Sequence, residues 1–172
     1  GNTLTVSDAD ISAETNGITS LNDAEVSNVV VSGVDTDGIT ITGGDASLDN
    51  VEVDSTNNGI SISGVNSEHF INSSTVTAVD IGIDVSAAST TIQDSEVTAA
   101  PDSLVDDGTA IAIDTTDSRI EDSVINDSSV GILVQSGNAN GHEIVRNEIL
   151  NNSDIGIEVQ SITDNAVRAN FN

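Results

Sequence analysis

Lysine, cysteine, methionine, tryptophan and tyrosine are absent from this chain of 172 residues, and proline occurs once. Without cysteine, disulfides give no indication of the redox compartment. No apolar run approaches the roughly 20 residues that a membrane-spanning helix needs, so we expect no membrane insertion. The only aromatic residues are Phe70 and Phe171, so the core must be built from isoleucine, valine, leucine and alanine. Stacked β-branched residues suit a narrow interior better than a broad globular core.

Positive charge is almost missing as well. Three arginines stand against 29 acidic residues, and the net charge is −26. Nucleic acid and anionic membranes are bound through basic patches, so neither is an expected partner. An acidic surface without lysine is typical of a halophilic protein kept soluble in concentrated salt, where screening removes self-repulsion. Bound divalent cations would neutralise the same surface, and both explanations stay open.

What the chain does contain is a repeat. A six-residue phrase, apolar–x–polar–small–x–apolar, recurs eight times, and a Gly-Ile or Ala-Ile phrase stands between successive copies. The copies begin at Val6, Val26, Leu48, Ile71, Ile92, Ile120, Ile144 and Val167. The steps between them are 20, 22, 23, 21, 28, 24 and 23 residues. A period in this range, built from strand-like units, predicts a solenoid.

Each phrase predicts very short strands. In Gly-Ile-x-Ile the two apolar residues are two apart, which is the period of a strand with one buried face. In the longer phrase, positions 1, 4 and 6 are expected to face inward. That spacing requires a bend at positions 2 and 3, where Asp, Asn and Ser concentrate. Because these strands cannot pair within one unit, they must pair with the same strands of the next unit and form parallel sheets.

This pair of phrases resembles the parallel β-helix repeat of the pectate-lyase-like superfamily. The resemblance covers Val6 to Phe171. It implies an all-β fold, a right-handed parallel β-helix (β-solenoid) of about seven coils with 20–24 residues per coil and one longer coil, in a single domain over residues 1–172. It implies little about activity, because the superfamily includes lyases, hydrolases, epimerases, adhesins and phage tailspikes.

The register predicts which side chains stack inside the coil. One internal column should contain Ile18, Ile39, Ile60, Ile83, Ile111, Ile132 and Ile157, and a second Ile41, Ile62, Val85, Ile113, Val134 and Val159. Position 4 of the longer phrase holds Ala9, Val29, Val51, Ser74, Ser95, Ser123, Asn147 and Asn170. Its later members predict an internal polar ladder that satisfies backbone groups at the bend.

Two segments depart from the period. Residues 98–109 lengthen one coil and contain the only proline, and residues 136–143 form a slightly longer Gly/Asn turn. Insertions of this kind project from a solenoid and often carry binding contacts. A tolerated surface insertion is the alternative for each.

The sequence indicates no catalytic residues. The resemblance implies that a lyase would need aspartate-bound calcium and an arginine or lysine base. Among the arginines, Arg146 follows Asp94 and Asp122 in one predicted column. An arginine there relieves repulsion between stacked carboxylates, so we interpret Arg146 as structural, with Arg119 and Arg168 close to the same edge.

The two histidines give no metal site. His69 and His142 each precede a copy of the longer phrase by two residues. They should therefore lie in one column but three coils apart, roughly 14 Å by coil spacing, which is too far to share a metal. We expect each to be a solvated turn residue.

Calcium is the cofactor with the best support, because Asp- and Asn-rich turns supply oxygen ligands. The candidate metal ligands are Asp35 and Asp37 beside Glu14 and Asn16 one coil earlier, and Asp106 and Asp107 beside Asp80. A solvated acidic turn is the alternative for both clusters.

Repeat phrases extend to both ends of the sequence, which predicts strand edges that self-associate. We therefore expect an extracellular structural or adhesive solenoid, which either stacks end to end into a filament or forms the stalk of a larger cell-surface protein. The alternative is a carbohydrate-binding or carbohydrate-cleaving module that contacts cell-surface carbohydrate. The lack of tryptophan and tyrosine, on which sugars stack, favours the structural hypothesis.

Overall fold

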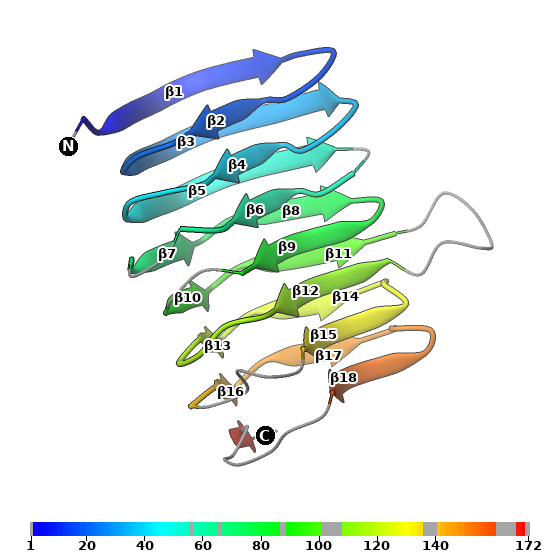
Figure 1. Ribbon diagram of the computed structural model, residues 1–172. Coiled ribbons are helices and arrows are strands. Elements are labelled where there is room, and N and C mark those ends of the chain that lie inside the picture. The colour runs from blue at the N-terminus through cyan, green and yellow to red at the C-terminus, as the bar shows by residue number, and fades with distance from the viewer. Residues whose placement is uncertain are drawn as a thin grey trace.

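In the computed structural model, short β-strands wind around one axis, and each coil lies directly on the previous one (Figure 1). The structure describes residues 2–55, 57–64, 67–86, 89–100, 108–135, 141–160 and 168–170. The described strands form two sheets, in which every pair is parallel and joins one coil to the next. The solenoid makes about six turns, close to the predicted seven, and confirms the predicted parallel β-helix.

The first sheet contains twelve of the described strands. They are β1 (Leu4–Ser12), β3 (Ala24–Val34), β5 (Ala46–Ser55), β7 (His69–Asn72), β8 (Thr75–Ala78), β10 (Thr90–Gln93), β11 (Glu96–Ala99), β13 (Arg119–Glu121), β14 (Val124–Asn126), β16 (Glu143–Val145), β17 (Glu148–Leu150) and β19 (Arg168–Asn170). The second sheet contains seven, which are β2 (Ile18–Ser20), β4 (Ile39–Ile41), β6 (Ile60–Ile62), β9 (Ile81–Val85), β12 (Thr109–Ile113), β15 (Val130–Val134) and β18 (Ile155–Val159).

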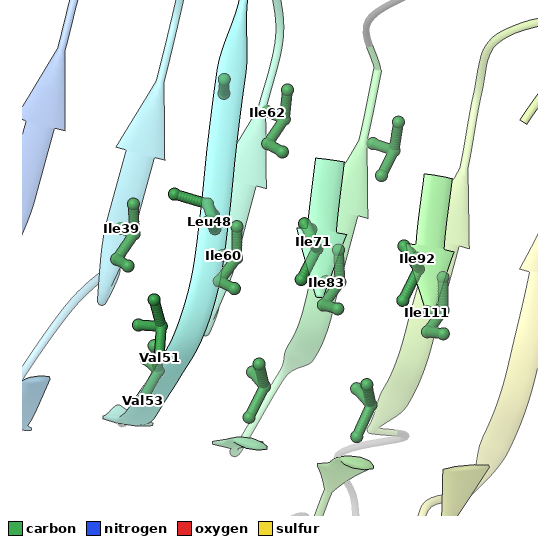
Figure 2. Packing of buried hydrophobic residues seen from close by; sticks show 14 of the residues in the cluster. Ile39, Leu48, Val51, Val53, Ile60, Ile62, Ile71, Ile83, Ile92 and Ile111 are labelled. Atoms are coloured by element: carbon green, nitrogen blue, oxygen red, sulfur yellow. The ribbon is translucent and has the colours of Figure 1, made fainter. Parts of the chain in front are cut away.

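The core is a set of columns that run along the axis (Figure 2). The backbone register pairs Ile18 with Ile39, Ile39 with Ile60, and so on to Ile157, and it aligns Ile41 through Val159 in the same way. Both predicted isoleucine columns are therefore confirmed. Most members are fully buried, and Ile39, Ile60 and Ile83 are 0% exposed.

The predicted bend in the longer phrase lies at its third position. One residue of each successive coil has a left-handed backbone there: Asp8, Asn28, Asn50, Ser73, Asp94, Asp122 and Arg146, with φ between 49° and 57°. Asn and Asp tolerate this conformation better than most residues. The backbone turns at this column, so positions 1 and 4 both face inward although they are three residues apart.

Parts of the predicted insertions lie outside the described residues. Within 98–109, Thr98 and Ala99 belong to β11 and Thr109 begins β12, while 101–107 lie outside. Within 136–143, residues 136–140 also lie outside. The part of the chain that the structure describes contains no helix that could cross a membrane.

Candidate functional site

An internal polar ladder runs behind the bend. The side-chain oxygens of Ser74, Ser95, Ser123 and Asn147 accept hydrogen bonds from the backbone N–H groups of Val51, Ser74, Ser95 and Ser123 at 3.0–3.2 Å. The three serine hydroxyls also donate to the carbonyl oxygens of Asn72, Gln93 and Glu121, each at 2.8 Å. The predicted ladder is therefore confirmed up to Asn147, and its polar groups are used in holding the coil.

Two arginines and three carboxylates form a network on the outer face of the first sheet. Arg146 donates from Nε and Nη2 to the Asp122 carboxylate at 2.8 and 2.5 Å, and from Nη2 to Glu121 at 2.6 Å. Arg119 donates to Glu121 at 2.8 Å and pairs with Glu143. The hydrogen bond from Arg119 lowers the pKa of Glu121, and the bond from Arg146 lowers the pKa of Asp122. Arg146 thus neutralises stacked carboxylates, as its column predicts.

The third arginine lies in register with this network. Arg168 in β19 is aligned with Glu143 in β16, which is aligned with Arg119 in β13. The charges in this outward column therefore alternate in sign along the axis. Opposite charges on neighbouring strands stabilise their pairing, so the mixed-charge patch has a structural role.

A second charged region lies on the outer face of the second sheet. Asp84, in the middle of β9, is partly buried and lies near Asp37, Asp80 and Asp114. Its burial, followed by the nearby carboxylates, raises the pKa of Asp84. Carboxylate repulsion is therefore concentrated at this point of the solenoid.

The predicted calcium ligands are only partly brought together. Asp37 and Asp80 both lie near Asp84, whereas Asp35 is exposed at the preceding turn and Asp106 and Asp107 lie outside the described residues. The Asp37 carboxylate accepts a hydrogen bond from Asn57 Nδ2 at 3.1 Å. Asn16, the predicted neighbour of Asp35 and Asp37 one coil earlier, accepts a hydrogen bond from Thr36 Oγ1. Within the described ranges, no three His, Asp or Glu side chains converge closely enough to hold a metal ion.

A groove of about 460 Å³ crosses the first four coils at the start of the first-sheet strands. Its lining includes Asp23, Glu25, Asp45, Glu68 and the ring of Phe70, which is 44% exposed. The backbone N–H of Asp45 donates to Asp23 Oδ1 at 3.1 Å, and that of Glu68 donates to Asp45 Oδ1 at 3.0 Å. The turn backbone therefore orients two of the four carboxylates. No repeat phrase in the sequence marks this groove.

The histidine prediction was half wrong. The register places His69 and His142 in one column three coils apart, as predicted. Both side chains are buried, however, with 2% and 1% of their surface exposed. Each stands two residues before an inward-facing isoleucine, Ile71 or Ile144, and strand alternation therefore turns it inward. That spacing is the sequence signal for their burial.

A family model described as right handed beta helix region matches residues 11–171. This chain belongs to the right-handed beta helix family. Searches of curated proteins and of solved structures each found no significant match. The family membership therefore establishes a β-solenoid domain.

Proposed function

We propose that this beta helix protein is an extracellular structural or adhesive rod whose terminal coils receive a further coil. The observation that supports this is the exposure of core columns at the two ends of the described solenoid. In β1 the inward-facing Leu4, Val6 and Ile11 are only partly buried. In β18, Ile157 is partly buried and Val159 is 36% exposed, although its column partners are buried. Each end coil thus presents strand positions that a further coil would cover.

We propose that the further coil comes from a second copy of this chain. Such a contact would set β18 of one copy against β2 of the next, extending the parallel register that already joins every described coil. The two surfaces are different, so the contact does not close and builds a filament. A coil of a longer polypeptide would use the same positions and make the domain part of a stalk.

Sedimentation velocity and electron microscopy across protein concentration and salt test this proposal. Because the net charge is −26, we expect association only in molar salt or with divalent cations, which screen repulsion between copies. Val159→Asp should abolish association by placing a charge in the end column. Phe70→Asp is the matched control, because Phe70 is 44% exposed and lies in β7, away from the two end coils. A monomer under every condition, or equal loss in both variants, would contradict the filament.

Calcium remains part of this proposal. Partial burial of Asp84 near Asp37 and Asp80 is the feature that supports cation binding on the second sheet. We expect calcium to raise the melting temperature and EDTA to lower it, compared with sodium chloride of equal ionic strength. Asp84→Asn should reduce the calcium effect, whereas Asp10→Asn on the exposed face of β1 should not. An unchanged melting temperature with and without calcium would refute a calcium site near Asp84.

A second candidate function is carbohydrate binding, and the groove beside Phe70 favours it. The groove has an exposed aromatic ring and carboxylates that can accept hydrogen bonds from sugar hydroxyls. Neutral or amino-sugar polymers suit its charge, because no arginine lines it. Binding of such a glycan by the native chain and loss of binding in Phe70→Ala would support this function. Equal binding by the native chain and Phe70→Ala would exclude the groove as the glycan-binding site.

A further inference from the structure

Both histidines of this chain occupy one interior column of the solenoid. After the partly buried Leu4 of the first coil, the column contains Ala24, Ala46, His69, Thr90, Ser118 and His142, one residue from each successive coil, and each of these six is at most 4% exposed. The other four members are small or carry a single hydroxyl group. An imidazole is the only group in this column that can gain a charge between pH 5 and 8.

His69 lies where a charge would be poorly accommodated. Neither of its ring nitrogens makes a hydrogen bond of normal geometry to the described residues. Burial lowers the pKa of His69 below its ordinary value of 6.5, and the Asp45 carboxylate and the Gly64 backbone oppose this shift only in part. Asp23 and Glu68 line the groove at the same corner, and Thr90 of β10, on the other side, is uncharged. The neutral imidazole is therefore the form that this corner stabilises.

His142 is held in a defined protonation form by a hydrogen bond. The backbone N–H of Ser118 donates to His142 Nδ1 at 3.1 Å. A proton on Nδ1 would remove this acceptor and leave the buried Ser118 N–H without it. The same column thus contains a second imidazole whose contact with the preceding coil depends on an unprotonated nitrogen.

We propose that this column makes the solenoid acid-sensitive, and that protonation of His69 opens the corner around β7 while the isoleucine columns remain packed. Neutral His69 stabilises the folded state fully at pH values above 6.5, the pKa of histidine in the unfolded chain. This stabilisation is lost as the pH falls through the lower pKa that His69 has in the folded state. The backbone bonds most affected are those from Ala46 N to Glu68 O and from His69 N to Ser89 O. Mild acid therefore separates β7 from β5 and β10 first.

Hydrogen exchange at pH 7.5 and 5.5, corrected for the intrinsic rate and measured in constant molar salt, tests the proposal. We expect several-fold faster exchange of the Ala46 and His69 amides at pH 5.5, with little change at Ile60 and Ile83 in the second sheet. His69→Thr places at this position the residue that the next coil uses, and it should abolish the acid effect. Asp10→Asn is the control for titration of exposed carboxylates and should leave the effect unchanged.

If His69→Thr does not fold, NMR titration of the His69 ring in the native chain tests the proposal instead. A midpoint below 6.5 that coincides with faster exchange at Ala46 supports the proposal. A midpoint at or above 6.5, or an acid effect that persists in His69→Thr, overturns it. Uniform acceleration over all coils would also overturn it, because the opening would then be global.

Discussion

Removal of one hydroxyl from the internal ladder, Ser95→Ala, tests whether polar side chains hold the bend. Ser95 is 3% exposed, and its Oγ accepts from Ser74 N at 3.2 Å and donates to the Gln93 carbonyl at 2.8 Å. The Gln93 carbonyl keeps a second donor, Ser73 N, at 3.2 Å. The main consequence is therefore a buried Ser74 N–H without its acceptor.

A buried backbone donor that loses its partner costs about 1–3 kcal/mol. For a chain of this size each kcal/mol lowers the melting temperature by about 2–4 °C, so the expected decrease is about 2–12 °C. Because each coil contacts only its neighbours, the damage should be local. Exchange of the Ser74 amide should accelerate more than that of amides two coils away. Thermal melting and hydrogen exchange together measure both effects.

Ser47→Ala is the matched control, because Ser47 lies on the exposed face of β5. A surface substitution of this kind changes the free energy of unfolding by no more than about 0.5 kcal/mol. Equal melting temperatures for the two variants would refute the reasoning, since the ladder would then contribute nothing beyond filling space. Fast exchange of the Ser74 amide in the native protein would refute it as well.

Three further predictions concern other columns. Gly59→Ala should destabilise the fold by about 1–3 kcal/mol in chemical denaturation, because the added Cβ would lie 2.5 Å from the carbonyl oxygen of Gly82 in the next coil. Gly156→Ala in the same column should have a small effect, because the atom nearest to its Cβ is 3.5 Å away. Arg146→Gln should raise the pKa of Asp122, measured by NMR, because the hydrogen bond that favours the carboxylate is lost; an unchanged value would contradict the network. Asp84→Asn should raise the melting temperature at pH 7 and low salt, because the raised pKa of the Asp84 carboxyl means that its negative charge opposes folding. The increase in melting temperature should shrink as the pH falls through this raised pKa. An increase that does not depend on pH would contradict the effect of the Asp84 charge.

The interior columns were predictable because parallel pairing copies a residue pattern from coil to coil. Once Ile39 and Ile60 occupy equivalent positions in the repeat, the register that buries one buries the other. The serine ladder followed from the same logic, since position 4 must face inward wherever positions 1 and 6 do. Ser74 and Ser95 could therefore be assigned to the interior without coordinates.

The predicted solvent exposure of the two histidines was wrong for a related reason. Ala24 and Ala46 are too small to mark a buried column by hydrophobicity, and a histidine after them resembles a turn residue. The groove beside Phe70 was hidden for another reason. It is formed by outward-facing residues, and these need not repeat from coil to coil.

The contrast between inner and outer columns indicates where the function of this family member resides. Inside the second sheet, Ile39, Ile60 and Ile83 repeat one residue type, because each must fill the same space above its neighbour. On the outer face of the same strands, Thr40 is followed by Ser61 and then by a partly buried Asp84. No packing requirement explains that change, so the outer residues are free to serve contacts with cations or glycans. Outside the Asp84 cluster, mutations in outer columns should therefore separate binding from stability, whereas mutations in inner columns should change both together.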